Sequence, residues 1–202
     1  LFFSQAWYLR GFTRLLVDMY RSPEYVERLF DKLLDYYVRT SRKIVEVGVH
    51  CIAYADDIAW QYGPIIPPGM FKKYYLPRLT SLINQVKKRN LHVFFHSDGD
   101  IKAFINHWIT AGIDIINPVQ PECVDPVWVK KKYGHLLTMH GTLSIQKTLP
   151  HGTPRDIARE VKERIRLCGM NGGLVLSPSN QVLEDTPIEN FLEIYRTAKK
   201  IR

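Results

Sequence analysis

Long apolar runs are what this sequence of 202 residues lacks. No stretch approaches the roughly 18 uninterrupted apolar residues of a membrane-spanning helix, and no secretory signal pattern is present. Cysteine is also scarce, since Cys51, Cys123 and Cys168 stand far apart and in no metal-binding spacing. An odd, scattered set of thiols predicts reduced cysteines in a cytoplasmic protein rather than a disulfide framework.

A glycine-rich phosphate loop is missing too. No G-x-G-x-x-G follows any apolar segment, which disfavours a dinucleotide-binding sheet. The charges are unbalanced, because the sequence has 28 Lys and Arg residues but only 20 Asp and Glu residues, which gives a net charge of +8. The basic residues lie on predicted helix faces, where charge runs usually contact solvent, and no nucleic-acid motif accompanies them. We therefore expect no nucleic-acid partner, although a basic surface can help to gather an anionic substrate.

Five short apolar segments are present, and a predicted helix follows each of them. They predict strands at 51–55, 91–95, 113–116, 136–139 and 174–176. Short strands that are apolar at successive positions are typical of parallel strands covered on both faces, and alternation with helices implies right-handed βαβ units. An open doubly wound sheet and a (β/α)8 barrel both fit this order. The polar strand ends favour the barrel, as does the apolar run at residues 1–3, which we interpret as a severed strand.

Capping signals place helix starts at Ser22, Asp125, Thr153 and Thr186. A helix is also predicted over 70–89, where Pro77 should kink it or split off its first turn. The proline-rich segment before this helix, 61–69, predicts a long, stiff loop.

Polar residues follow all five predicted strands. In a parallel α/β protein the carboxyl ends of the strands lie on one face, where sites are built. We predict three catalytic residues, Asp57, His96 and Asp98, because imidazole and carboxylate groups on one rim can transfer protons. His96 and Asp98 are two residues apart and so point the same way on an extended chain, where they could also hold a metal weakly. The residues predicted to bind substrate are Asp56, Asn117, Gln120, His140 and Asn180.

Structural roles compete with these predictions. One of the two carboxylates at Asp56 and Asp57 could cap a neighbouring segment instead of meeting substrate. His96 and His140 could each be a hydrogen-bonded histidine of the core.

Several motifs resemble the uroporphyrinogen decarboxylase superfamily. They are found at 6–18, 56–57, 96–99, 117–121, 149–153 and 185–187, in the family's order. The superfamily also contains zinc-dependent methyltransferases that move methyl groups between corrinoid proteins and thiols. The resemblance implies a TIM barrel, of which residues 1–202 would be the carboxyl-terminal part, from about the third strand to the eighth helix.

The two branches of the superfamily differ in their sites. The decarboxylases need no metal or cofactor, and their last strand usually carries Gly-His-Gly-Ile where this chain has Ser-Asn-Gln-Val at 179–182. The methyltransferases bind zinc through His-x-Cys on the fifth strand and a cysteine on the eighth. Here Asp98 replaces the first cysteine and Asn180 the second, so the thiolate site is not present as such.

We therefore expect an enzyme that decarboxylates an anionic tetrapyrrole or related carboxylated substrate without a cofactor, with at most a weakly held zinc. The alternatives are a corrinoid-linked methyltransferase with an altered metal site, and a non-catalytic binding module on the same barrel. The expected partner is a small anionic substrate, a tetrapyrrole or a corrinoid, with no membrane and no nucleic acid. A homo-oligomer is compatible with the sequence.

Overall fold

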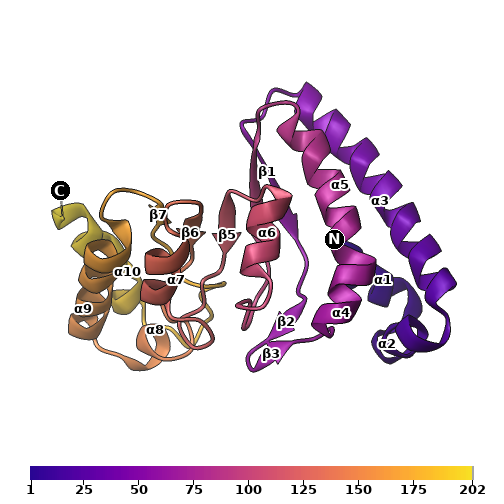
Figure 1. Cartoon of the computed structure of the whole chain (residues 1–202). Helices are drawn as coiled ribbons and strands as arrows, with labels where there is room; N and C mark the ends of the chain where they lie inside the picture. The colour runs from indigo at the N-terminus through magenta and orange to yellow at the C-terminus, as the bar shows by residue number, and fades with distance from the viewer. Residues whose placement is uncertain (202) are drawn as a thin grey trace. The chain divides into compact units, whose positions relative to one another are not determined.

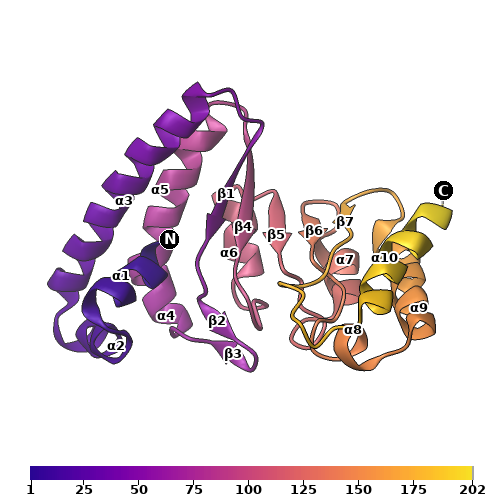
Figure 2. The same cartoon turned by 180° about the vertical axis from the view of Figure 1, so that it is seen from behind.

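The structure, a computed structural model, describes residues 1–201 and divides into two compact units, Leu1–Ile115 and Ile116–Arg202. Both units combine helices with parallel strands, so the chain is an α/β protein (Figures 1 and 2). Among the residues described, no helix combines the length and the apolar character needed to cross a membrane.

The first unit opens with three helices, which are followed by strands, a hairpin and three more helices. In chain order these elements are α1 (Phe2–Arg10), α2 (Phe12–Arg21), α3 (Pro23–Glu46), β1 (Cys51–Ala55), β2 (Ala59–Trp60), β3 (Gly63–Pro64), α4 (Pro68–Met70), the π-helical turn η1 (Phe71–Tyr75), α5 (Leu76–Lys87), β4 (His92–His96) and α6 (Ile105–Ala111).

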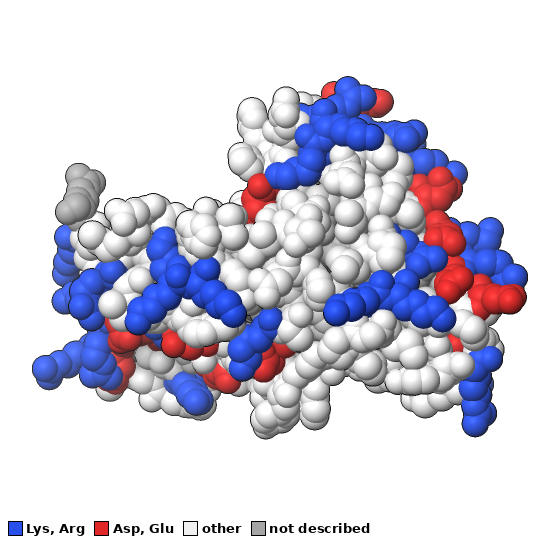
Figure 3. Space-filling view, in the orientation of Figure 1, with Lys and Arg blue, Asp and Glu red and all other residues white. Residues whose placement is uncertain are grey.

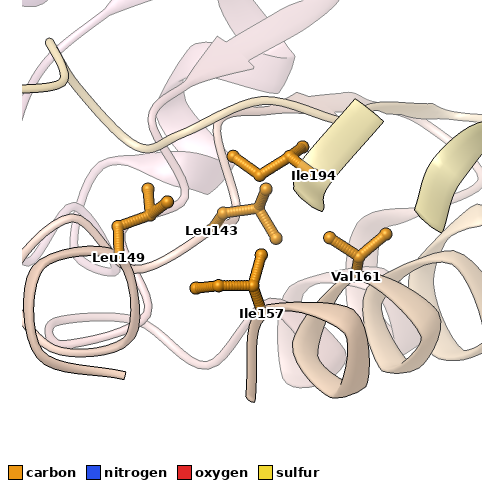
Figure 4. Close-up of a cluster of buried hydrophobic side chains, with 5 residues drawn as sticks. All are labelled: Leu143, Leu149, Ile157, Val161 and Ile194. Atoms are coloured by element: carbon orange, nitrogen blue, oxygen red, sulfur yellow. The ribbon is translucent and has the colours of Figure 1, made fainter. Parts of the chain in front are cut away.

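Strand β5 (Ile115–Asn117) begins at the boundary between the units, and the second unit continues with short strands and helices. These are α7 (Pro126–Tyr133), β6 (Thr138–His140), α8 (Thr148–His151), α9 (Pro154–Arg164), the π-helical turn η2 (Ile165–Gly169), β7 (Leu174–Val175) and α10 (Ile188–Lys200). Strands β6 and β7 are parallel. Figure 4 shows a core cluster of this unit, in which Leu143 packs among side chains of α8, α9 and α10.

The pairing of β1 with β4 positions the candidate site. The two strands are parallel and in register from Cys51 opposite His92 to Ala55 opposite His96. The amide of Asp56 continues the ladder by donating to the carbonyl of His96 at 2.9 Å. The residues that follow both strands therefore leave the sheet at the same edge.

Residues 1–3 are not a severed strand, and this prediction is wrong. Phe2 and Phe3 form the first turn of α1, and both are buried. An apolar run of three residues does not by itself distinguish a strand from a buried helix. In the structure the carboxylate of Asp56 accepts hydrogen bonds from the amides of Phe3 and Ser4, which satisfies two donors at the helix start and stabilises the helical turn.

The other helix signals were confirmed at most positions. Helix α3 begins directly after Ser22, as predicted, although the Ser22 side chain makes no capping hydrogen bond in the described part of the chain. Asp125 caps α7, and Thr153 forms a full capping box with Asp156 at the start of α9. Pro77 lies in the first turn of α5, and the predicted helix over 70–89 changes there from the π-helical turn η1 to the α-helix α5.

Two local predictions need correction. Thr186 makes no capping hydrogen bond within the described residues, because Pro187 occupies the position before α10 and leaves Thr186 one residue too early. The predicted loop at 61–69 contains part of a short antiparallel hairpin, β2–β3, in which Trp60 pairs with Gly63.

Candidate functional site

Three predicted catalytic residues meet at the shared end of β1 and β4. The potential ligand atoms of Asp57, His96 and Asp98, here called the Asp57 cluster, all lie within 4.8 Å of one another. Nε2 of His96 is 3.6 Å from Oδ1 of Asp57 and 3.8 Å from Oδ1 of Asp98. The amide of Asp98 donates to Oδ1 of Asp57 at 3.0 Å, which joins the two strand ends directly.

The Asp57 cluster is open to a ligand. The side chain of His96 is 26% exposed, and those of Asp57 and Asp98 are 53% and 38% exposed. Imidazole can donate and accept a proton, while a carboxylate accepts hydrogen bonds from N–H groups. The cluster therefore has the groups needed for proton transfer to or from a bound molecule.

Asp56, the neighbour of this cluster, has a different environment. It is 2% exposed, and its carboxylate accepts from the Phe3 amide at 2.8 Å, the Ser4 amide at 2.7 Å and the Tyr75 hydroxyl at 2.7 Å. Burial, and then the nearby Asp56 carboxylate, raise the pKa of Tyr75 well above its ordinary value, so its hydroxyl stays a donor. These bonds give Asp56 a role in holding α1 and η1, and its contact with substrate stays a prediction.

A glycine that the sequence reasoning did not single out fixes the loop after β4. Gly99 has a φ of +90°, and a Cβ at this position would lie 2.5 Å from the carbonyl oxygen of Trp60. The next residue, Asp100, donates its amide to the same carbonyl at 2.8 Å. The sequence shows only that a glycine directly follows the His-Ser-Asp segment. Its contact with the hairpin could not be predicted from the sequence.

The second unit brings together another predicted pair. Nδ2 of Asn117 donates to Nδ1 of His140 at 2.7 Å, and the hydroxyl of Ser177 lies 3.4 Å from the same nitrogen. Gln120 is buried, whereas Asn180 is exposed and its Oδ1 accepts from the amide of Gln181. That these residues share one site with the Asp57 cluster stays a prediction.

Two hollows of the second unit are lined by other residues. One, of about 290 Å³, is lined by carboxylates that already accept hydrogen bonds within the protein. Glu160 accepts one from the Ser144 amide at 3.0 Å, and Glu122 accepts one from the Ser144 hydroxyl. The other, of about 520 Å³, lies along the basic face of α9. On the face in Figure 3, Lys and Arg side chains lie in several separate groups, with acidic side chains beside most of them. This distribution is compatible with solvated helix faces.

The donor set of the Asp57 cluster does not fit a zinc–thiolate centre. It offers two carboxylates and one imidazole, and no sulfur. Cys51 is the first residue of β1, at the strand end away from the cluster. Cys168 is buried, and this burial raises the pKa of its thiol, which disfavours the thiolate that zinc requires.

Comparison with known proteins identifies the family. The family model described as "Uroporphyrinogen decarboxylase (URO-D)" matches residues 3–201. The chain belongs to the uroporphyrinogen decarboxylase family. The resemblance drawn from the sequence motifs is thereby confirmed.

The curated relatives of this chain are named for two different activities, methyl transfer and decarboxylation. A methylated-thiol–coenzyme M methyltransferase of Methanosarcina mazei is 23% identical over 199 residues, which are 98% of this chain and 51% of the relative. A uroporphyrinogen decarboxylase of Trichodesmium erythraeum is 24% identical over 194 residues, 95% of this chain and 52% of the relative. The chain thus spans about half the length of these relatives, and both are named as enzymes.

A solved structure shows the same fold. A methyltransferase from Methanosarcina mazei superposes with a TM-score of 0.75 and 20% sequence identity, covering 94% of this chain and 53% of that one. This likeness supports an α/β fold with parallel strands, as the strand pairing within each unit indicates.

Proposed function

We propose that residues 1–202 are the carboxyl-terminal part of a TIM-barrel enzyme that removes CO2 from a small anionic, carboxylated substrate without a cofactor. An anionic tetrapyrrole or a related molecule is the proposed substrate class. The observation that carries the proposal is the Asp57 cluster, where two carboxylates lie within 4 Å of the same imidazole nitrogen, Nε2 of His96, at a strand end. Sites of TIM-barrel enzymes lie at such ends.

Decarboxylation replaces a carboxylate group of the substrate with a proton. The bond between the substrate carbon and its carboxylate breaks, CO2 leaves, and a proton takes its place on that carbon. In the proposed mechanism the imidazole of His96 supplies this proton, and the carboxylates of Asp57 and Asp98, each within 4 Å of its Nε2, attract the ring when it carries the proton. An exposed carboxylate such as Asp57 can also accept a hydrogen bond from an N–H group of the substrate.

The remaining predicted residues are proposed to bind the substrate. The Asn117–His140 pair offers an amide and an imidazole, which suit carboxylate or ring N–H groups. Gln120 and Asn180 carry amides of the same kind, and Asp56 would act mainly by holding the elements around the cluster.

The second candidate is a corrinoid-linked methyltransferase with an altered metal site. The Methanosarcina mazei relative favours it, and the Asp57 cluster could hold a divalent ion weakly through oxygen and nitrogen donors. No step of the proposed decarboxylation depends on such an ion.

An activity panel on the full-length protein tests the proposal. We expect CO2 release from a tetrapyrrole carboxylate such as uroporphyrinogen, and no methyl transfer from a methylated corrinoid protein to a thiol. The variant His96→Gln should lose at least about 100-fold in rate, the usual contribution of a general acid. The matched control is His135→Gln, at an exposed histidine after α7. Methyl transfer without CO2 release would favour the second candidate, and substrate binding without either reaction would favour a binding module.

A further inference from the structure

The hairpin β2–β3 presents two aromatic side chains to solvent. Trp60 is 56% exposed and Tyr62 is 80% exposed, and their rings meet edge to face with centroids 5.2 Å apart. We call Trp60 and Tyr62 the aromatic pair. Two large aromatic rings exposed side by side leave apolar area in water, which a bound molecule can cover.

The base of this hairpin is fixed. Ile58 and Ala59, just before Trp60, are buried, and the amide of Ile58 donates to the hydroxyl of Ser97 at 3.2 Å. The carbonyl of Trp60 accepts the amide of Asp100, and the amide of Ile65 donates back to the carbonyl of Ile58 at 2.9 Å. Aromatic rings on a fixed base offer contact area at a small cost in conformational entropy.

The aromatic pair and the Asp57 cluster are carried by the same two segments. Asp57 lies three residues before Trp60, and Gly99, whose backbone packs against the Trp60 carbonyl, directly follows Asp98. Figures 1 and 2 show the hairpin beyond the carboxyl end of β1, the end from which Asp57 extends. Short backbone connections therefore join the base of the hairpin to the segments that carry the Asp57 cluster.

We infer that the aromatic pair is a stacking surface that selects substrates with a flat aromatic ring. The ring would stack on the face of one ring of the aromatic pair and meet the edge of the other, while its polar groups contact the Asp57 cluster. Stacking on aromatic side chains favours flat π systems over saturated rings of the same size and charge. The inference rests on the proposed function for the identity of this ligand as the substrate.

Small carboxylates matched in charge test the inference. Ligand-observed NMR on the full-length protein measures the dissociation constants of benzoate, which is flat, and cyclohexanecarboxylate, which is not. We expect benzoate to bind about fivefold more tightly, the effect of one aromatic contact. In Trp60→Leu and Tyr62→Leu, which keep an apolar side chain, the preference should fall toward equality. The matched control is Tyr20→Leu, at a tyrosine of α2 that is 65% exposed, and it should keep the preference.

A second pair of probes tests the polar side of the site. Pyrrole-2-carboxylate has a ring N–H that furan-2-carboxylate lacks, so it should bind more tightly, and Asp57→Asn should reduce this difference. Circular dichroism of each variant checks that it folds. Equal binding of benzoate and cyclohexanecarboxylate, no binding of either, or a preference that survives in the double variant Trp60→Leu/Tyr62→Leu would overturn the inference. A flat-ring preference in a protein that releases no CO2 would instead support the inference and refute the proposed reaction.

Discussion

The buried carboxylate of Asp56 should make an unusually large contribution to stability. In Asp56→Asn the side chain keeps its shape, but one oxygen becomes an NH2 group. Oδ2 accepts from Phe3 and Tyr75, and Oδ1 accepts from Ser4. Whichever way the amide turns, its NH2 group faces a donor at one of these positions.

The magnitude follows from these bonds. A hydrogen bond to a charged group contributes about 1.5–3 kcal/mol and a neutral one about 1 kcal/mol. The substitution removes at least one charged bond and makes the others neutral, and it also removes a negative charge from the start of α1. We expect a loss of about 3 kcal/mol in the free energy of unfolding.

Urea unfolding of the full-length protein, followed by circular dichroism, measures this loss. The matched control is Asp35→Asn, whose side chain is 64% exposed in an ion pair with Arg39 one helical turn away. Such a surface pair contributes less than about 1 kcal/mol. If Asp56→Asn were no more destabilising than Asp35→Asn, the assignment of Asp56 as the anchor of α1 would be refuted.

Three further predictions concern the surroundings of the site. Gly99→Ala should lower the free energy of unfolding by more than about 1 kcal/mol and weaken substrate binding, because the new Cβ meets the Trp60 carbonyl at a φ of +90°; unchanged urea unfolding and unchanged binding would show that the hairpin adjusts freely. The pKa of Tyr75 is raised in the folded state, so the stability it contributes is complete below its ordinary value of 10.0 and is lost as the pH rises beyond it. Urea unfolding between about pH 9 and 11 should therefore show a smaller alkaline loss in Tyr75→Phe than in the wild type, and equal losses would contradict this. Zinc analysis of protein purified without chelator should find less than one equivalent after dialysis, since the Asp57 cluster contains no thiolate; stoichiometric zinc that disappears in His96→Ala would instead support the methyltransferase candidate.

Local signals predicted most of the fold. The strand over 51–55 and the helix starts at Ser22, Asp125 and Thr153 were predicted from apolar periodicity and capping residues, which act within a few positions of the chain. Residues 1–3 were predicted wrongly, and a group that stabilises their helical turn, Asp56, lies more than 50 positions away. No periodicity within three residues can report such a contact.

In the candidate site, too, some features could be predicted from the sequence and others could not. His96 and Asp98 could be paired from their spacing, and Asp57 could join them because neighbouring parallel strands end at one edge. The burial of Asp56 under Tyr75 depends on helix packing, and the contact between Gly99 and Trp60 depends on how two loops meet. These features required the three-dimensional structure.

Isotope incorporation during turnover tests the central claim most directly, that the Asp57 cluster supplies the proton that replaces CO2. The full-length protein is given the carboxylated substrate in D2O, and CO2 release and product mass are measured together. We predict one deuterium on the product carbon for each CO2 released, with both signals reduced at least about 100-fold in His96→Gln and unchanged in His135→Gln. Undiminished CO2 release by His96→Gln, or product formed by methyl transfer without CO2, would contradict the account.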